Sequence, residues 1–167
     1  PDQWKSIPFD DRLSMRLHSD GFFSTDGSRA FGKLMHEIIS NIEAADDIET
    51  AVEQRYISGE LTADEKYEVA ASLKTVLSMP DIQEWYSGKY QVLNETQVLI
   101  PTSTFSRPDR VMIADNEVIV VDYKFGDLEE KRHKRQVERY VRHIKEMGYS
   151  HVKGYVFYVN KGVKYEI

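Results

Sequence analysis

The succession of apolar patterns along the chain predicts an α/β fold in which helices flank a central mixed β-sheet. Up to residue 88 the apolar residues recur mostly at helical spacing, so 28–88 is expected to be a mainly helical N-terminal segment. From residue 89 onward, short β-branched runs alternate with turn signals, interrupted by one amphipathic helix expected over 129–147. Strands on both sides of a helix are typical of a mixed sheet covered by helices, and 89–167 is therefore predicted to be the sheet core.

The N-terminal segment is expected to contain three main helical stretches. The first begins near Ser28 and buries one stripe, formed by Phe31, Leu34, Met35, Ile38, Ile39 and Ile42. Two further stretches fill 46–79 and are separated by a break at Ser58-Gly59. Thr62 and Glu65 have the spacing of a capping box, which predicts the start of the last of these helices.

The second half of the chain predicts five strands, at 91–100, 107–114, 117–124, 152–159 and 163–167. The second and third are joined by Asp115-Asn116, a two-residue hairpin signal. With these two residues as the loop, Ala114 faces Glu117, and counting back along both strands places Asp109 opposite Asp122. The expected helix between the third and fourth strands turns Val137, Tyr140, Val141, Ile144 and Met147 inward.

The facing pair of Asp109 and Asp122 is the most informative feature of the sequence. Two carboxylates side by side on one face of a sheet repel each other, so the pair is not explained by stability. A divalent cation removes the conflict, and oxygen-rich sites of this kind suit magnesium and manganese. Lys124, two residues beyond Asp122, lies on the same face. Two acidic metal ligands and an adjacent lysine are the groups needed to hydrolyse a phosphodiester.

Composition narrows the classes of protein. The 167 residues fit one domain with a real core. Without cysteine the chain can hold no disulfide, no thiolate zinc site and no cysteine-ligated iron–sulfur cluster. No long apolar run predicts a membrane span, and no leader predicts secretion, so we expect a cytoplasmic protein without membrane contact. The start at Pro1 suggests a piece cut from a longer chain, although tag removal or processing is equally compatible.

Net charge is −6, which argues against binding nucleic acid by bulk charge. The charge is uneven, however, because positive residues gather in the helix expected over 129–147: Lys131, Arg132, Lys134, Arg135, Arg139, Arg142 and Lys145. Taken alone, such a run indicates a solvated helix face.

Four motifs occur in order along the chain: Gly32-Lys33-Leu34-Met35-His36, Arg107-Pro108-Asp109, Asp122-Tyr123-Lys124 and Gln136-Val137-Glu138-Arg139-Tyr140. Together they resemble the PD-(D/E)XK nuclease superfamily, in particular the RecB-like nuclease domains of bacterial helicase–nucleases. Because the chain lacks cysteine, it looks like the cluster-free, AddA-like type. One departure is Ser106-Arg107-Pro108, where the family often has a glycine shortly before the first aspartate.

The resemblance implies a restriction-endonuclease-like core and a set of site residues. Asp109, Asp122 and Lys124 would be catalytic, with Mg²⁺ or Mn²⁺ held by His36, Asp109, Asp122 and the backbone carbonyl of Tyr123. Gln136 and Tyr140 would contact the DNA backbone or Lys124; on residue type alone they could be ordinary helix residues. A lone helical histidine such as His36 is more often a hydrogen-bonded core residue than a ligand. Glu95 is either a water-mediated metal partner or a solvated strand acid.

The implied function is metal-dependent hydrolysis of DNA, single-stranded or at duplex ends, by the nuclease domain of a repair or recombination helicase–nuclease. On this reading residues 1–167 form one nuclease domain cut from a longer chain, and the helicase module is its partner. Two alternatives stay open: a catalytically silent nucleic-acid-binding module of a helicase, and a standalone endonuclease of the restriction or resolvase kind. The sequence does not separate exonuclease from endonuclease action, or one metal from two.

Overall fold

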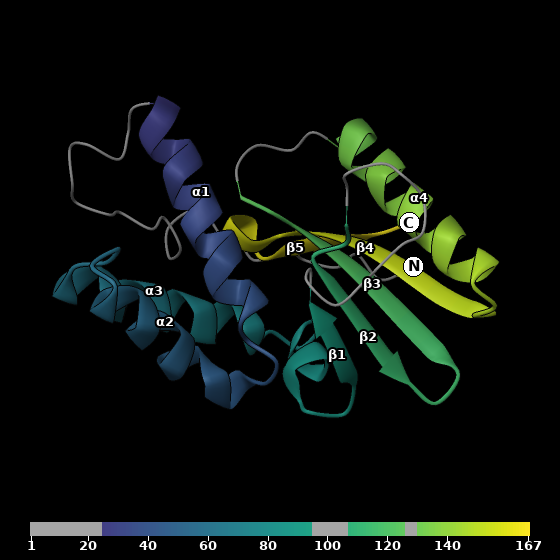
Figure 1. The fold of residues 1–167 in the computed structure, drawn as a ribbon, viewed down its shortest axis with the longest axis horizontal. Helices are drawn as coiled ribbons and strands as arrows, with labels where there is room; N and C mark the ends of the chain where they lie inside the picture. The colour runs from purple at the N-terminus through teal and green to yellow at the C-terminus, as the bar shows by residue number, and fades with distance from the viewer. Residues whose placement is uncertain (1–24, 95–106, 126–129) are drawn as a thin grey trace, which may run out of the picture.

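A computed structural model describes residues 25–94, 107–125 and 130–167 and confirms the predicted α/β class with a central mixed sheet flanked by helices (Figure 1). The elements in chain order are α1 (Thr25–Ser40), η2 (Ala45–Asp47), α2 (Ile48–Ile57), α3 (Ala63–Leu77), η3 (Gln83–Tyr86), β1 (Gln91–Asn94), β2 (Arg110–Ala114), β3 (Glu117–Lys124), α4 (Glu130–Glu146), β4 (His151–Tyr158), η4 (Val159–Lys161) and β5 (Val163–Glu166). Within these ranges, no helix is long and apolar enough to cross a membrane.

The sheet has the strand order β1-β2-β3-β4-β5, with β3 in the centre. Among the strands of the described ranges, β3 and β4 alone run parallel, and α4 lies between them in the chain. The predicted hairpin register is confirmed, since Ala114 pairs with Glu117 and Arg110 pairs with Val121. Asp115 takes a positive φ of 47° in the turn, which an aspartate tolerates. Continuing the register by one residue puts Asp109 opposite Asp122.

Helices cover both faces of the sheet, with α1, α2 and α3 on one side and α4 on the other (Figure 1). Alternate residues of β3 serve the two faces: Ile119, Val121 and Tyr123 join the core under α1–α3, whereas Val118 and Val120 pack against α4. Every residue from Val118 to Tyr123 is buried, as expected for a central strand covered on both sides. Asp122 and Lys124 therefore belong to the α4 face.

Glycine lets α4 approach the sheet closely. A Cβ on Gly154 of β4 would lie 2.6 Å from Val137 Cγ1 and 2.6 Å from Val141 Cγ2, closer than real contacts allow. With hydrogen there instead, Val137 and Val141 of α4 can pack directly against β4.

Most predicted boundaries agree with the structure. The break after α2 is where it was expected, and the capping box is present: Thr62 Oγ1 accepts from Glu65 N–H, and Glu65 Oε2 accepts from Thr62 N–H. Helix α1 begins at Thr25 rather than near Ser28. Of the first predicted strand, 91–94 is observed as β1 and the rest lies outside the described residues.

One expected core residue was placed wrongly. Met147 was expected to face inward, but it is 52% exposed. The helix ends at Glu146, and Gly148 follows with a positive φ of 103°, so Met147 lies past the last helical residue and leaves the buried stripe. The other four residues of that stripe are buried or half-buried.

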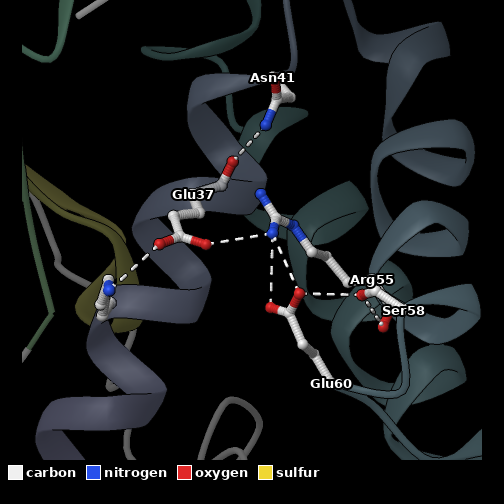
Figure 2. Close-up of polar contacts among 6 residues, drawn as sticks. Glu37, Asn41, Arg55, Ser58 and Glu60 are labelled. Atoms are coloured by element: carbon white, nitrogen blue, oxygen red, sulfur yellow. Dashed lines mark hydrogen bonds and ion pairs between the residues drawn. The ribbon is translucent and has the colours of Figure 1, made fainter.

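A network of ion pairs connects α1 to the hairpin formed by α2 and α3 (Figure 2). Arg55 Nη1 lies 3.1 Å from Glu37 Oε2 on α1 and 3.2 Å from Glu60 Oε1 in the turn after α2. Ser58 Oγ donates to the same Glu60 oxygen at 2.9 Å. The network thus connects α1, which carries His36, to the α2–α3 hairpin.

Candidate active site

The site lies where β3 ends and β2 begins, between α1 and α4. Asp109, directly before β2, is only 7% exposed. Its Oδ2 accepts from the backbone N–H of Tyr123 at 2.6 Å, and its Oδ1 lies 2.7 Å from His36 Nε2. The helix carrying His36 packs here through Gly32, whose missing Cβ would lie 3.7 Å from Phe125 Cβ. Three of the four sequence motifs thus meet at the Asp109 carboxylate.

Asp122 is almost completely buried, at 1% exposed. Burial and the neighbouring Asp109 carboxylate raise the pKa of Asp122 from 3.8 to about 6, against the opposing effect of Lys124. Lys124 Nζ lies 2.5 Å from Asp122 Oδ2, yet that oxygen is buried and accepts no hydrogen bond of normal geometry. The anionic form of Asp122 is therefore disfavoured even beside Lys124, because burial and Asp109 outweigh the lysine.

A chain of polar contacts runs from Lys124 to α4. Lys124 Nζ donates to Gln136 Oε1 at 3.3 Å, and Gln136 Nε2 donates to Tyr140 Oη at 2.8 Å. The Tyr140 hydroxyl donates to the carbonyl of Arg107 at 2.9 Å. The structure therefore brings Gln136 and Tyr140 to the predicted site and places Gln136 directly on Lys124.

Tyr123 alternates to the opposite face from Asp122, as predicted. Its ring is buried in the core under α1–α3, and its hydroxyl lies 2.8 Å from that of Tyr86. Burial raises the pKa of both hydroxyls, so both stay protonated near neutral pH. The side chain of Tyr123 is thus structural, and its contribution to the site comes through the backbone.

Arg110 is a site-supporting residue that the sequence did not reveal. It is fully buried and donates to three backbone carbonyls: Ile42 at 2.6 Å, Glu43 at 2.8 Å and Trp85 at 2.8 Å. Its guanidinium also lies 4.3 Å above the Tyr86 ring. Because Arg110 directly follows Asp109, these hydrogen bonds connect this part of the site to the segment after α1. The only signal was a charged residue on the same strand face as the core residue Met112.

Replacing Arg110 with methionine should lower the free energy of unfolding by about 2–4 kcal/mol, because three buried or partly buried carbonyls lose their donor. Urea unfolding followed by circular dichroism measures this. Arg135→Met is the matched control, since Arg135 is exposed on α4 and should change stability little. A loss no larger than that of the control would contradict the structural role of Arg110.

The side chains around Asp109 and Asp122 fit a divalent cation in part. Within the described ranges, no group of three or more His, Asp and Glu side chains stands ready as a cation site. Two features nevertheless fit one: the buried Asp122 oxygen without a hydrogen bond, and the hard oxygen ligands of the Asp109–Asp122 pair. His36 Nε2 lies 2.7 Å from Asp109 Oδ1, so this nitrogen is shared with that carboxylate. Glu95 lies outside the described residues.

The positive residues of α4 turn away from the sheet. Lys131, Arg132, Arg135, Arg139, Arg142 and Lys145 are exposed, whereas Val137, Tyr140 and Ile144 are buried against the strands. The same helix therefore carries the Gln136–Tyr140 pair on its inner side and a basic face on its outer side.

No protein-family model matches the chain, and no curated protein matches it. The resemblance to RecB-like nucleases thus depends on the four motifs and their order.

Proposed function

We propose that this chain is a Mg²⁺- or Mn²⁺-dependent deoxyribonuclease domain of the RecB-like kind, acting on single-stranded DNA or on DNA ends. The observation that carries the proposal is the buried Asp109–Asp122 pair beside Lys124, in which Asp122 is destabilised as an anion. An arrangement that costs stability at neutral pH and keeps a lysine ammonium at its edge is characteristic of a functional site.

The assigned residues have different roles in the proposed reaction. Asp109, Asp122, the Tyr123 carbonyl and His36 would hold the cation, which when bound supplies positive charge at the scissile phosphate. Lys124 adds a second positive charge that stabilises the pentavalent transition state and orients the attacking water. Gln136 holds the lysine in place, and Tyr140 holds Gln136.

Substrate binding is assigned to the outer side of α4. Its exposed lysines and arginines attract the phosphodiester backbone without reading sequence. Because the rest of the molecule is acidic enough to give a net charge of −6, DNA should be directed to this face. A linked helicase that delivers the strand, in a cytoplasmic setting, completes the proposed context.

The direct test is cleavage of an end-labelled single-stranded oligonucleotide by the purified chain, with and without added metal. We expect cleavage with Mg²⁺ or Mn²⁺, its loss in excess chelator, and its return when the cation is restored. The expected physical reason is that Asp122 and Asp109 repel each other until a cation is bound. Cleavage that persists in chelator, or a protein inert with both cations, would rule out the proposal.

A further inference from the structure

Arg107 lies at the rim of the proposed active site, directly ahead of Pro108-Asp109. Its carbonyl accepts from the Tyr140 hydroxyl at 2.9 Å, and that hydroxyl accepts from Gln136 Nε2 at 2.8 Å. Gln136 Oε1 in turn accepts from Lys124 Nζ at 3.3 Å. A continuous row of hydrogen bonds therefore connects the backbone of Arg107 to the proposed catalytic lysine.

The backbone of Arg107 is held by buried neighbours. Tyr140, which binds its carbonyl, is 1% exposed. The next residue, Pro108, is buried and restricts Arg107 to extended conformations. One residue further, Asp109 accepts from the backbone N–H of Tyr123 at 2.6 Å. The point from which the Arg107 side chain leaves the backbone is therefore fixed by residues of the site.

The side chain of Arg107 is exposed, in contrast to this anchored backbone. Within the part of the chain that the structure describes, it makes no hydrogen bond or ion pair. Arg110, three residues on, is the opposite case, because it is fully buried and donates to three backbone carbonyls. Arg110 thus serves the fold, whereas the N–H donors of Arg107 stay available to a ligand at the rim of the site.

An anionic substrate needs positive charge at this end of the sheet. A phosphodiester that approaches Asp109 and Asp122 is repelled by both carboxylates and attracted by Lys124. A guanidinium suits a phosphate, because its planar fork donates two parallel hydrogen bonds to two oxygens. Two residues of extended chain separate Arg107 from Asp109 by at most about 7 Å, a distance that an arginine side chain can cover.

We propose that the Arg107 guanidinium binds the phosphate being cleaved, together with Lys124. The inference rests on the proposed nuclease function and adds a catalytic residue to it. The guanidinium donates to the non-bridging oxygens, whose negative charge increases as the water attacks. The contact is therefore stronger in the transition state than in the ground state. Because it is made to the DNA backbone, it acts on every sequence alike.

Side-chain truncation tests this role, because Tyr140 holds Arg107 through its backbone and the anchor remains. Arg107→Ala should lower kcat for a single-stranded oligonucleotide about 10-fold or more and raise KM about 3–10-fold. The urea midpoint should not change. Arg107→Lys keeps the charge and should recover part of the loss, whereas Arg107→Gln should not. An unchanged kcat in folded Arg107→Ala overturns the proposal.

Lys89→Ala is the matched control, since it also removes one exposed positive charge. Lys89 precedes β1, whose residue Gln91 pairs with Ile113, so it lies near the end of β2 that is far from Asp109. Cleavage by Lys89→Ala should equal that of the wild type. A loss as large as that of Arg107→Ala would mean that net charge, and not a contact at the site, causes the effect, and would overturn the proposal.

A binding measurement separates this inference from the nuclease proposal. Fluorescence anisotropy of a labelled oligonucleotide is followed in Mn²⁺ with Lys124→Ala protein, in which cleavage is slow. Adding Arg107→Ala should raise Kd about 3–10-fold and reduce the slope of log Kd against log salt by about 0.7, the value for one phosphate contact on a single strand. An unchanged Kd and slope overturn the contact, even if the wild type cleaves DNA. The expected changes, in a protein whose wild type cleaves nothing, overturn only the nuclease.

Discussion

Replacing Lys124 with alanine is expected to lower the rate of DNA cleavage by a factor of about 10²–10⁴, the usual effect of removing one charge that stabilises a transition state. The lysine ammonium lies 2.5 Å from Asp122 Oδ2 and 3.3 Å from Gln136 Oε1, so its position is determined by the site. A single-turnover assay with saturating cation measures the chemical step itself.

The chain offers a matched control in Lys153. This lysine also pairs with a carboxylate, Glu117, at 2.6 Å, but at the other end of β3, and its side chain is 52% exposed. Lys153→Ala should leave cleavage unchanged. Lys124→Ala should remain folded, although Asp122 loses its cationic neighbour. Wild-type turnover in a folded Lys124→Ala protein would remove the lysine from the mechanism.

Part of this site could be predicted because it depends on local geometry. The hairpin places Asp109 near Asp122 through a two-residue loop, and the alternation of a strand then assigns Lys124 to the same face and Tyr123 to the other. These relations need only sequence spacing. The same holds for the capping box of α3 and for the inner stripe of α4.

The rest of the site depends on how elements that are distant in the sequence pack together, and the spacing of residues along the sequence does not show this. His36 meets Asp109, which lies 73 positions further along the sequence, and only the resemblance indicated this contact. Arg110 could not be assigned because its acceptors are backbone carbonyls of remote turns. The contact of Gln136 with Lys124 likewise depends on the close approach of α4 to the sheet at Gly154.

Replacing Asp122 with asparagine should abolish cleavage and yet stabilise the protein at neutral pH in the absence of divalent cations. The folded pKa of Asp122 is raised from 3.8 to about 6 by burial and by Asp109, so the folded state holds this proton more tightly than the unfolded chain. The stability that this group contributes is therefore fully present below pH 3.8 and is lost as the pH rises through about 6. An asparagine carries no charge to bury and escapes that loss.

The size and the pH dependence of the effect distinguish this explanation from a general change in stability. At about 1.4 kcal/mol for each pKa unit, a rise from 3.8 to about 6 amounts to about 3 kcal/mol above pH 7. Urea unfolding in chelator should show Asp122→Asn close to the wild type near pH 4 and more stable by up to that amount at pH 8. Added Mn²⁺ should stabilise the wild type and have little effect on the variant, because a ligand of the folded state has been removed. An equal difference in stability at both pH values would show that Asp122 is not a destabilised anion. An equal response of the two proteins to Mn²⁺ would show that Asp122 is not a metal ligand. The repulsion between the facing carboxylates would then have to destabilise Asp109 instead.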